Sequence, residues 1–89
     1  MSLIEDYDII KGALSTEKCV RLIDSENTIV FVVDKRASRD DVKRGVKALF
    51  NVVPLRVNTM VDTLGRKKAF VKFDRGVLAK DLATSMGVL

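Results

Sequence analysis

The chain of 89 residues has the length of one domain, residues 1–89, and its 47% hydrophobic and 31% charged residues are typical of a globular rather than a disordered protein. Its net charge of +4 favours a polyanionic partner, either nucleic acid or an anionic membrane surface. Because the sequence has no histidine and one cysteine, Cys19, it excludes internal disulfides, histidine-containing metal sites and histidine-based catalysis, so we expect no cofactor.

The first part of the chain predicts a strand followed by a helix. Residues 8–14 suit a short strand, and Ser15 is placed to cap a helix that runs from Thr16 to Ser25. Glu17 would then lie in the first turn, where the helix dipole favours an anion. The residues expected to face inward are Cys19, Leu22 and Ile23.

A central strand and a second helix come next. Residues 28–33 are almost all β-branched or apolar, which predicts a buried strand. Ser38, with Asp41 three residues later, predicts a helix that begins with a capping box, and Asn51 is expected to end it. The inward stripe of this helix is expected to contain Val42, Val46, Leu49 and Phe50.

Residues 54–73 predict a β-hairpin. Pro54 opens the first strand, and residues 57–63 and 67–73 alternate around a turn at 64–66, where Gly65 or a neighbour takes a positive φ. The apolar sets of the two strands share a face only if paired residue numbers have an even sum, because a slip of one residue turns every side chain over. The expected pairs are Asn58 with Lys72, Met60 with Phe70 and Asp62 with Lys68.

The last predicted element is a helix after residues 74–76. It carries Leu78, Leu82 and Met86 at four-residue spacing and ends at Gly87. The order strand, helix, strand, helix, strand, strand, helix predicts an α+β sandwich with helices packed on one face of a largely antiparallel four-stranded sheet. The other face of the sheet would be free for a partner.

Basic residues concentrate on the second helix and on the hairpin. Arg39, Lys43 and Lys47 recur every four residues and form a stripe, which by itself also fits an ordinary solvated helix face. Together with the hairpin cations, the stripe favours contacts to phosphates. From the charge pattern we predict that eleven basic residues contact nucleic acid: Lys11, Lys35, Arg36, Arg39, Lys43, Lys47, Arg56, Arg66, Lys67, Lys68 and Lys72.

No arrangement of residues predicts catalysis. Asp40 and Asp41 diverge on a helix and are explained by capping, and Ser15, Thr16 and Ser85 have no histidine base. The glycines are isolated, so no phosphate-binding loop is present. We therefore expect a protein that is not an enzyme.

Two alternatives remain open from the residues alone. Residues 66–73 resemble the octamer of RNA recognition motif domains in its last five positions, but Lys67 and Lys68 stand where a glycine and a stacking aromatic are expected. Only Phe70 is left to stack, so a single-strand RNA-binding module is one alternative. A small-molecule-sensing regulatory module is the other, because small α+β sandwiches often have that role.

Several segments, in matching order and spacing, resemble the ribosomal protein L23 family of the large subunit. Residues 14–18 are similar to its S/T-E-K segment, and residues 27–33 to its N-x-hydrophobic strand. Residues 49–52 leading to 57–59 match an L-F-x-V…V-N-T run, and residues 67–71 match K-K-A-Y/F-V. The resemblance covers nearly the whole chain.

The resemblance implies a structural, cytoplasmic constituent of the large ribosomal subunit that binds rRNA near the polypeptide exit tunnel, beside neighbouring large-subunit proteins. It also implies a docking surface for nascent-chain factors such as the signal recognition particle, with Glu17 as the candidate docking residue. On positions that match the family, it adds Lys18, Asn58 and Thr59 to the candidate rRNA contacts and supports Lys67 and Lys68.

Two departures from the family pattern imply an archaeal-type member. Bacterial members carry a long hairpin loop that reaches into the tunnel, whereas the turn expected here is Leu64-Gly65-Arg66. The long basic N-terminal extension of eukaryotic members is missing. No membrane insertion is expected, because no apolar run is long enough to cross a bilayer.

Overall fold

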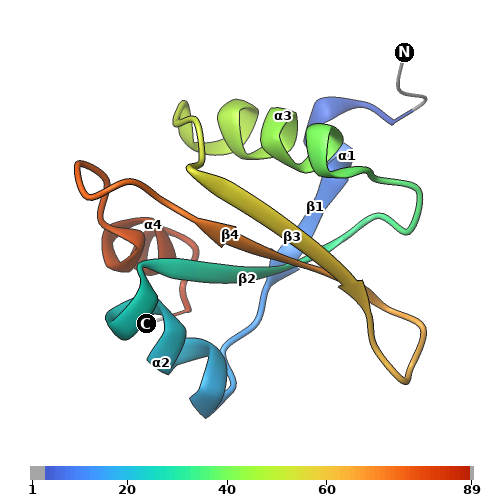
Figure 1. Ribbon diagram of the computed structural model, residues 1–89. Coiled ribbons are helices and arrows are strands. Elements are labelled where there is room, and N and C mark those ends of the chain that lie inside the picture. The colour runs from blue at the N-terminus through green and yellow to red at the C-terminus, as the bar shows by residue number, and fades with distance from the viewer. Residues whose placement is uncertain (1–3, 89) are drawn as a thin grey trace.

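The computed structural model describes residues 4–88 and shows an α+β fold with a four-stranded antiparallel sheet (Figure 1). The elements in chain order are α1 (Asp6–Ile9), β1 (Ile10–Ala13), α2 (Glu17–Glu26), β2 (Thr28–Val33), α3 (Arg39–Phe50), β3 (Arg56–Val61), β4 (Lys67–Lys72) and α4 (Ala79–Ser85). The predicted class and the order of the seven expected elements are confirmed. The strand expected over residues 8–14 is shorter, because its first residues belong to the helical turn α1. No helix within the described residues is long and apolar enough to cross a membrane.

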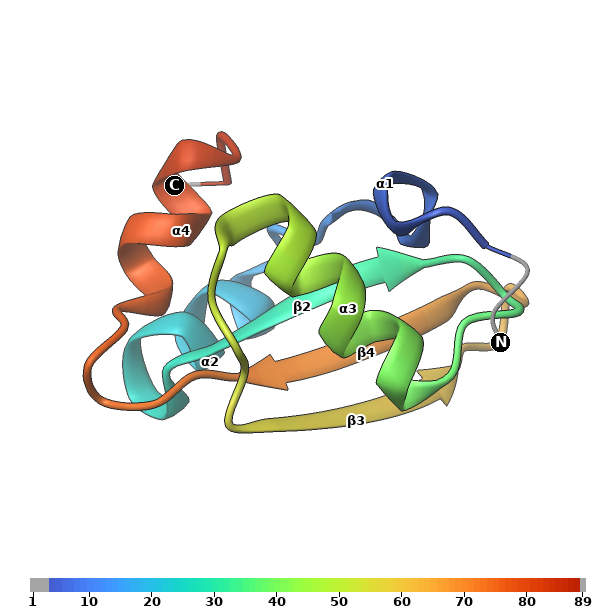
Figure 2. The same cartoon turned by 90° about the horizontal axis from the view of Figure 1, so that it is seen from above.

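The sheet has the strand order β1-β2-β4-β3, with every neighbouring pair antiparallel. The apolar strand β2 is therefore an inner strand, as its composition predicts. Strands β2 and β3 run in the same direction and are joined by α3, which crosses over the sheet (Figure 2). Strand β4 lies between β2 and β3, so a late segment of the chain completes the sheet.

The β3–β4 hairpin has the predicted even parity but not the predicted pairs. The register is offset by two residues from the expected one, so the predicted partners were wrong while every side chain lies on its predicted face. The observed pairs are Arg56 with Lys72, Asn58 with Phe70, and Met60 with Lys68. The strand begins at Arg56 rather than at Pro54.

The turn of the hairpin explains this offset. The carboxylate of Asp62 accepts hydrogen bonds from the backbone N–H groups of Leu64 and Arg66, each at 2.9 Å. These bonds draw Asp62 out of the strand and make it the first residue of the turn. Gly65 has a φ of +82°, which a residue with a Cβ rarely adopts, so the glycine is needed there as expected.

The hydrophobic core lies between one face of the sheet and helices α3 and α4, and it also includes Ile9 of α1 and Ile23 of α2. Val42 and Val46 of α3 are fully buried, and the ring of Phe50 packs 6.1 Å from that of Phe31, measured between centroids. Leu49, which was expected in the same stripe, is 51% exposed. The buried stripe keeps a strict four-residue spacing, and position 49 lies beside it on the solvent side.

Helix α2 does not share the face that α3 covers. Figures 1 and 2 show α3 across one face of the sheet and α2 against the other, next to β2. Val30, whose side chain is on the second face, is consequently only 1% exposed. The expectation that all helices pack on one face therefore does not hold for α2, and the near-continuous apolar sequence of β2 reflects burial on both sides.

The helix ends use short polar residues. Thr16, rather than the predicted Ser15, caps α2, and its hydroxyl accepts a hydrogen bond from the N–H of Cys19 at 3.3 Å. The predicted capping box of Ser38 and Asp41 at the start of α3 is confirmed. Asn51 ends α3 in the left-handed region, also as predicted.

Helix α4 buries alanines where the sequence suggested a leucine stripe. Ala79 and Ala83 are fully buried, Leu82 and Met86 are partly buried, and Leu78 is exposed. Small side chains let the helix backbone approach the core closely, which turns the larger residue at the helix start outward. The helix ends near Gly87, which has a positive φ as expected of a stop.

Candidate nucleic-acid interface

The sheet face opposite α3 is here called the outer face. Its members follow from the register, because directly opposite residues of antiparallel strands share a face. They are Thr28, Val30 and Val32 from β2, Lys68, Phe70 and Lys72 from β4, and Arg56, Asn58 and Met60 from β3. Lys68 and Lys72 therefore lie away from α3, as predicted.

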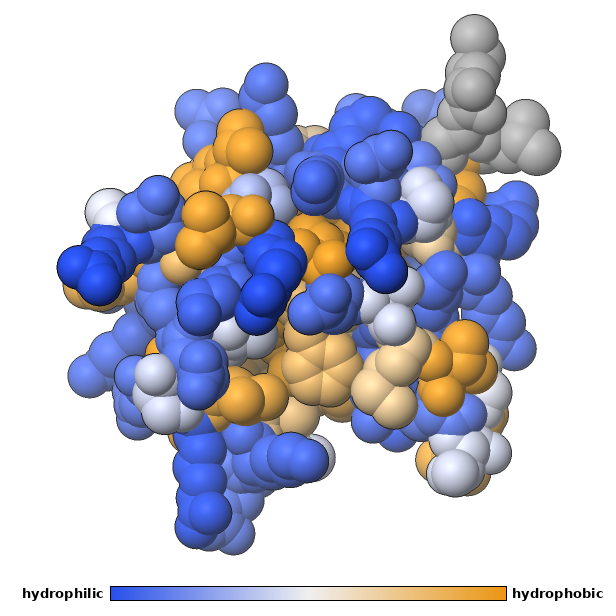
Figure 3. Space-filling view, in the orientation of Figure 1, coloured by the Kyte–Doolittle hydropathy of each residue, from blue (hydrophilic) through white to orange (hydrophobic). Residues whose placement is uncertain are grey.

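A shallow hollow lies on the outer face between α2 and the hairpin. It is lined by Leu22, Glu26, Thr28, Arg56, Asn58, Thr59, Met60, Phe70 and Lys72, and we call it the outer hollow. Figure 3 shows apolar surface exposed in this region and hydrophilic side chains around it. Met60 is 48% exposed, and Phe70 is half-buried. The hollow thus combines an apolar floor with a charged rim.

Acidic residues hold two of the lysines of the outer face loosely. The ammonium of Lys72 lies 3.8 Å from the Glu26 carboxylate, and that of Lys68 lies 3.5 Å from Asp62. The Lys72–Glu26 pair is a surface pair of the kind that contributes about 0–1 kcal/mol, so a phosphate can replace the carboxylate at little cost. The Lys68–Asp62 pair is less exposed, but Asp62 keeps its bonds from Arg66 and from the turn N–H groups when Lys68 leaves it. Arg56 makes no ion pair with any described residue.

The tip of the hairpin is organised by Asp62 and Arg66. The guanidinium of Arg66 lies 3.1 Å from the Asp62 carboxylate, which also accepts the two turn N–H bonds. Burial of that carboxylate raises its pKa, but the hydrogen bonds from the backbone of Arg66 and Leu64 and from the Arg66 side chain outweigh it. The net result is a pKa for Asp62 below its ordinary value.

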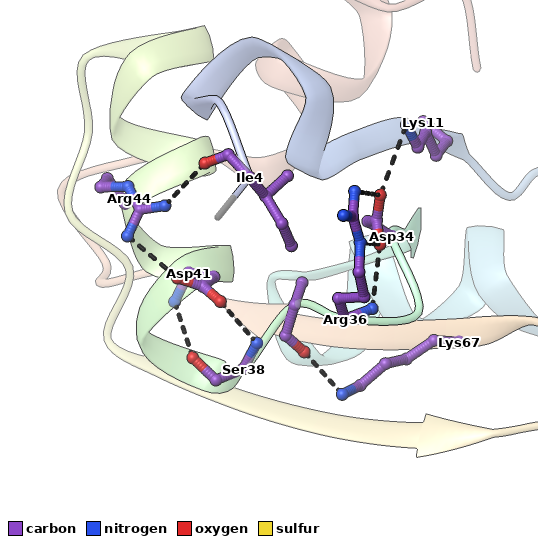
Figure 4. A network of polar contacts seen from close by, with 9 residues as sticks. Ile4, Lys11, Asp34, Arg36, Ser38, Asp41, Arg44 and Lys67 are labelled. Atoms are coloured by element: carbon purple, nitrogen blue, oxygen red, sulfur yellow. Dashed lines mark hydrogen bonds and ion pairs between the residues drawn. The ribbon is translucent and has the colours of Figure 1, made fainter. Parts of the chain in front are cut away.

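A second shallow groove lies where β2 runs into the loop before α3. It is lined by Lys11, Val32, Val33, Asp34, Lys35, Arg36, Arg66 and Lys67, so it brings together five of the predicted contacts. Asp34 is the only acid among them, and it pairs with Arg36 at 3.1 Å and with Lys11 at 3.8 Å (Figure 4). The hydrogen bond from the Arg36 side chain lowers the pKa of Asp34 to about 2.

Lys67 differs from its neighbour Lys68 in what it contacts. Its position in β4 is on the inner face, and its ammonium donates a hydrogen bond to the carbonyl of Ala37, in the loop before α3 (Figure 4). Ala37 is fully buried. Lys67 therefore helps to attach this loop to the sheet, in addition to bordering the groove.

The stripe is carried by α3, which covers the opposite face of the sheet from the outer face (Figures 1 and 2). Arg39, Lys43 and Lys47 are exposed, and none of them forms an ion pair with a residue in the described range 4–88. Arg44, on the same helix, has partners: its guanidinium bonds the carboxylate of Asp41 and the carbonyl of Ile4 (Figure 4). It also bonds the carboxylate of Asp6. The predicted basic residues therefore form separate surfaces on two sides of the sheet.

The remaining predicted residues lie around α2 and on β3. Glu17 and Lys18 are exposed at the start of α2, and Glu17 bonds Arg21 one turn later at 2.9 Å. Thr59 is half-buried on β3. Sequence reasoning missed Leu22 and Glu26 as part of the outer hollow, because nothing local indicates that α2 packs beside Phe70.

Within residues 4–88, no group of three or more Cys, Asp and Glu side chains is arranged to hold a metal ion. The charged groups described above are instead suited to binding a polyanion.

Comparison with known proteins gives a consistent result. The family model described as Ribosomal protein L23 matches residues 8–79. A protein of Methanococcus vannielii named "Large ribosomal subunit protein uL23" is 36% identical over 85 residues, which cover 96% of this chain and 99% of the relative. The protein of the same name from Methanococcus aeolicus is 38% identical with the same coverage. Both relatives are archaeal, in agreement with the type expected from the short hairpin turn.

Proposed function

The chain belongs to the ribosomal protein L23 family, and on this basis we propose that it is a constituent of the large ribosomal subunit that binds rRNA near the polypeptide exit tunnel. Its partners there are rRNA and neighbouring ribosomal proteins, and its role is structural rather than enzymatic. Family membership favours this function over the single-strand RNA-binding module and the small-molecule-sensing module.

The observation that carries rRNA binding is that several of the predicted cations are not neutralised by the chain itself. Four acids among the described residues form ion pairs with cations in or beside loops and turns: Asp6, Asp34, Asp41 and Asp62. The predicted contacts without an ion pair to any described residue are Lys18, Lys35, Arg39, Lys43, Lys47, Arg56 and Lys67, and the ammonium of Lys67 bonds the Ala37 carbonyl instead. When such side chains neutralise phosphates, the counterions condensed on the nucleic acid are released, and this release drives binding.

The test is the affinity of the purified protein for large-subunit rRNA as a function of salt. We expect log affinity to fall linearly with log salt, and the double variant Lys43→Ala/Lys47→Ala to flatten the slope by about 0.7–0.9 for each phosphate that is no longer neutralised. Arg75→Ala/Lys80→Ala is the matched control, since these cations are also exposed and unpaired within residues 4–88 but were not predicted to contact rRNA. Binding without salt dependence, or an equal effect of both double variants, would contradict the proposal.

We also propose that the start of α2 contributes to a docking surface for nascent-chain factors. Glu17 supports this because its carboxylate is exposed at the helix start, where Arg21 is its partner within the described residues. Charge reversal by Glu17→Lys should weaken binding of the signal recognition particle to reconstituted subunits, while Asp24→Lys on the same helix should not. Equal binding by both variants would exclude Glu17 as a docking residue.

A further inference from the structure

Phe70 occupies the centre of the outer face, in the middle of the inner strand β4. Val30 and Asn58 lie directly opposite it on either side. The other rings that pack together, Phe31 and Phe50, are on the core side, and no ring of the described residues contacts Phe70. A half-buried aromatic with no aromatic partner, in a hollow open to solvent, offers a platform for a flat ligand.

The polar groups around Phe70 match the parts of a nucleotide. Lys68 and Lys72 stand two residues before and after it on the same face, so each lies about 7 Å along the strand, on the two sides of the ring. Asn58 places an amide beside the ring, with both a donor and an acceptor for a base edge. Arg56 adds an unpaired cation, among the described residues, at the rim.

The walls of the outer hollow restrict what can enter. Leu22 of α2 and Met60 of β3 are both among its lining residues, and both are apolar side chains that can adjust to pack against a base. Lys72, which lines the hollow, is held by a weak surface pair to Glu26, and Lys68, beside the hollow on the outer face, lies 3.5 Å from Asp62, whose carboxylate also has Arg66 as a partner. These pairs can give way to phosphates on either side of a bound base.

We propose that the outer hollow receives a single unpaired nucleobase of rRNA, which stacks on Phe70 while Lys68 and Lys72 hold the flanking phosphates. This inference rests on the proposed function, since it assumes that rRNA reaches the outer face. It adds to that function a specific subsite: recognition of one extruded base, in place of phosphate contacts alone. Base–aromatic stacking of this kind is how proteins commonly bind unstacked nucleotides.

The test uses the full-length variant Phe70→Leu, with Leu64→Ala as the control, since Leu64 is an exposed apolar side chain at the hairpin tip, outside the hollow. Both proteins are first compared with the wild type by thermal unfolding. We expect Phe70→Leu to lower the affinity for large-subunit rRNA about five- to 150-fold with an unchanged salt slope, because the variant cannot stack on a base but keeps every charge. Chemical probing of the bound rRNA should show one nucleotide whose base is protected by the wild type and by Leu64→Ala but not by Phe70→Leu.

Two outcomes would overturn the inference and leave the proposed function intact. Salt-dependent binding of the wild type together with equal affinity and equal base protection for Phe70→Leu would show that no base stacks there. If Phe70→Leu binds naked rRNA as tightly as the wild type does and is defective only in assembled subunits, a protein side chain rather than a base fills the outer hollow. If the wild type itself fails to bind rRNA, the proposed function fails first.

Discussion

At the scale of single residues, Asn27 carries more of the structure than its sequence context suggests. It ends α2 in the left-handed region with a φ of 51°, a role that glycine also fills. Its side chain then reaches the segment before α4: the amide nitrogen donates to the carbonyls of Phe73, Asp74 and Val77, and the amide oxygen accepts the N–H of Ala79 at 2.8 Å. One side chain thus joins the end of α2 to the start of α4.

We predict that Asn27→Gly lowers the free energy of unfolding by about 2–3 kcal/mol, because the left-handed backbone is retained while a group of part-buried hydrogen bonds is removed. Asn51→Gly is the matched control: Asn51 also ends a helix with a φ of 58° but is exposed, so its replacement should change stability by a few tenths of a kcal/mol. Urea unfolding of the two variants measures both values. Equal destabilisation would mean that backbone conformation alone explains Asn27.

At the scale of elements, the hairpin depends on a charged carboxylate. The pKa of Asp62 is lowered in the folded protein, so its charged form stabilises the turn above the ordinary pKa of 3.8. That contribution is lost as the pH falls below 3.8 and through the lower folded value, because the protonated group accepts the turn N–H bonds less strongly. The pKa of Asp34, lowered to about 2, acts in the same direction at the neighbouring loop.

We therefore predict that the backbone amide signals of Leu64 and Arg66 titrate together in NMR spectra, with a midpoint below 3.8. In Asp62→Asn this titration should vanish at both amides, while the turn persists, because the Asn side-chain oxygen still accepts hydrogen bonds. If these amides still titrate in Asp62→Asn, another acid causes the effect. A midpoint above 3.8 would mean that folding raises the pKa of Asp62, which contradicts the prediction.

At the scale of the whole molecule, one sheet separates two environments. The inner face carries the core with α3 and α4, and the outer face carries α2, the hollow and two lysines. The parity of the hairpin decides which residues enter which environment. A charge placed on the inner face in the middle of the sheet cannot reach water without unfolding the domain.

We predict that Val71→Asp is unfolded at 25 °C and shows no cooperative thermal transition. Val71 is fully buried, and an unpaired buried charge costs several kcal/mol against a total stability of about 5–15 kcal/mol. Val61→Asp is the control. Val61, on β3, is on the same face of the sheet as Val71 but lies at the end of the strand and is 63% exposed, so its replacement should change stability by less than about 1 kcal/mol. Circular dichroism during thermal unfolding distinguishes them. A cooperative transition in Val71→Asp near the wild-type midpoint would contradict the assigned faces.

The capping box of Ser38 and Asp41, the stop at Asn51 and the faces of β3 and β4 were all predictable, because each depends on residues within a few positions of one another. The pairing of β3 with β4 was predictable only in parity. Period-two patterning sets the face of each side chain, but the register depended on the hydrogen bonds of Asp62 in the turn.

The sequence by itself determined the α+β class, the basic character of the surface and the separation of Lys68 from the core, because local periodicity and charge encode them. Only the tertiary structure decided that α2 packs against the outer face beside Phe70, that Lys67 bonds Ala37, and that the stripe belongs to a helix on the opposite face of the sheet from Lys68 and Lys72. Each of these depends on segments far apart in the chain meeting across the sheet, and no pattern within one segment specifies such a meeting.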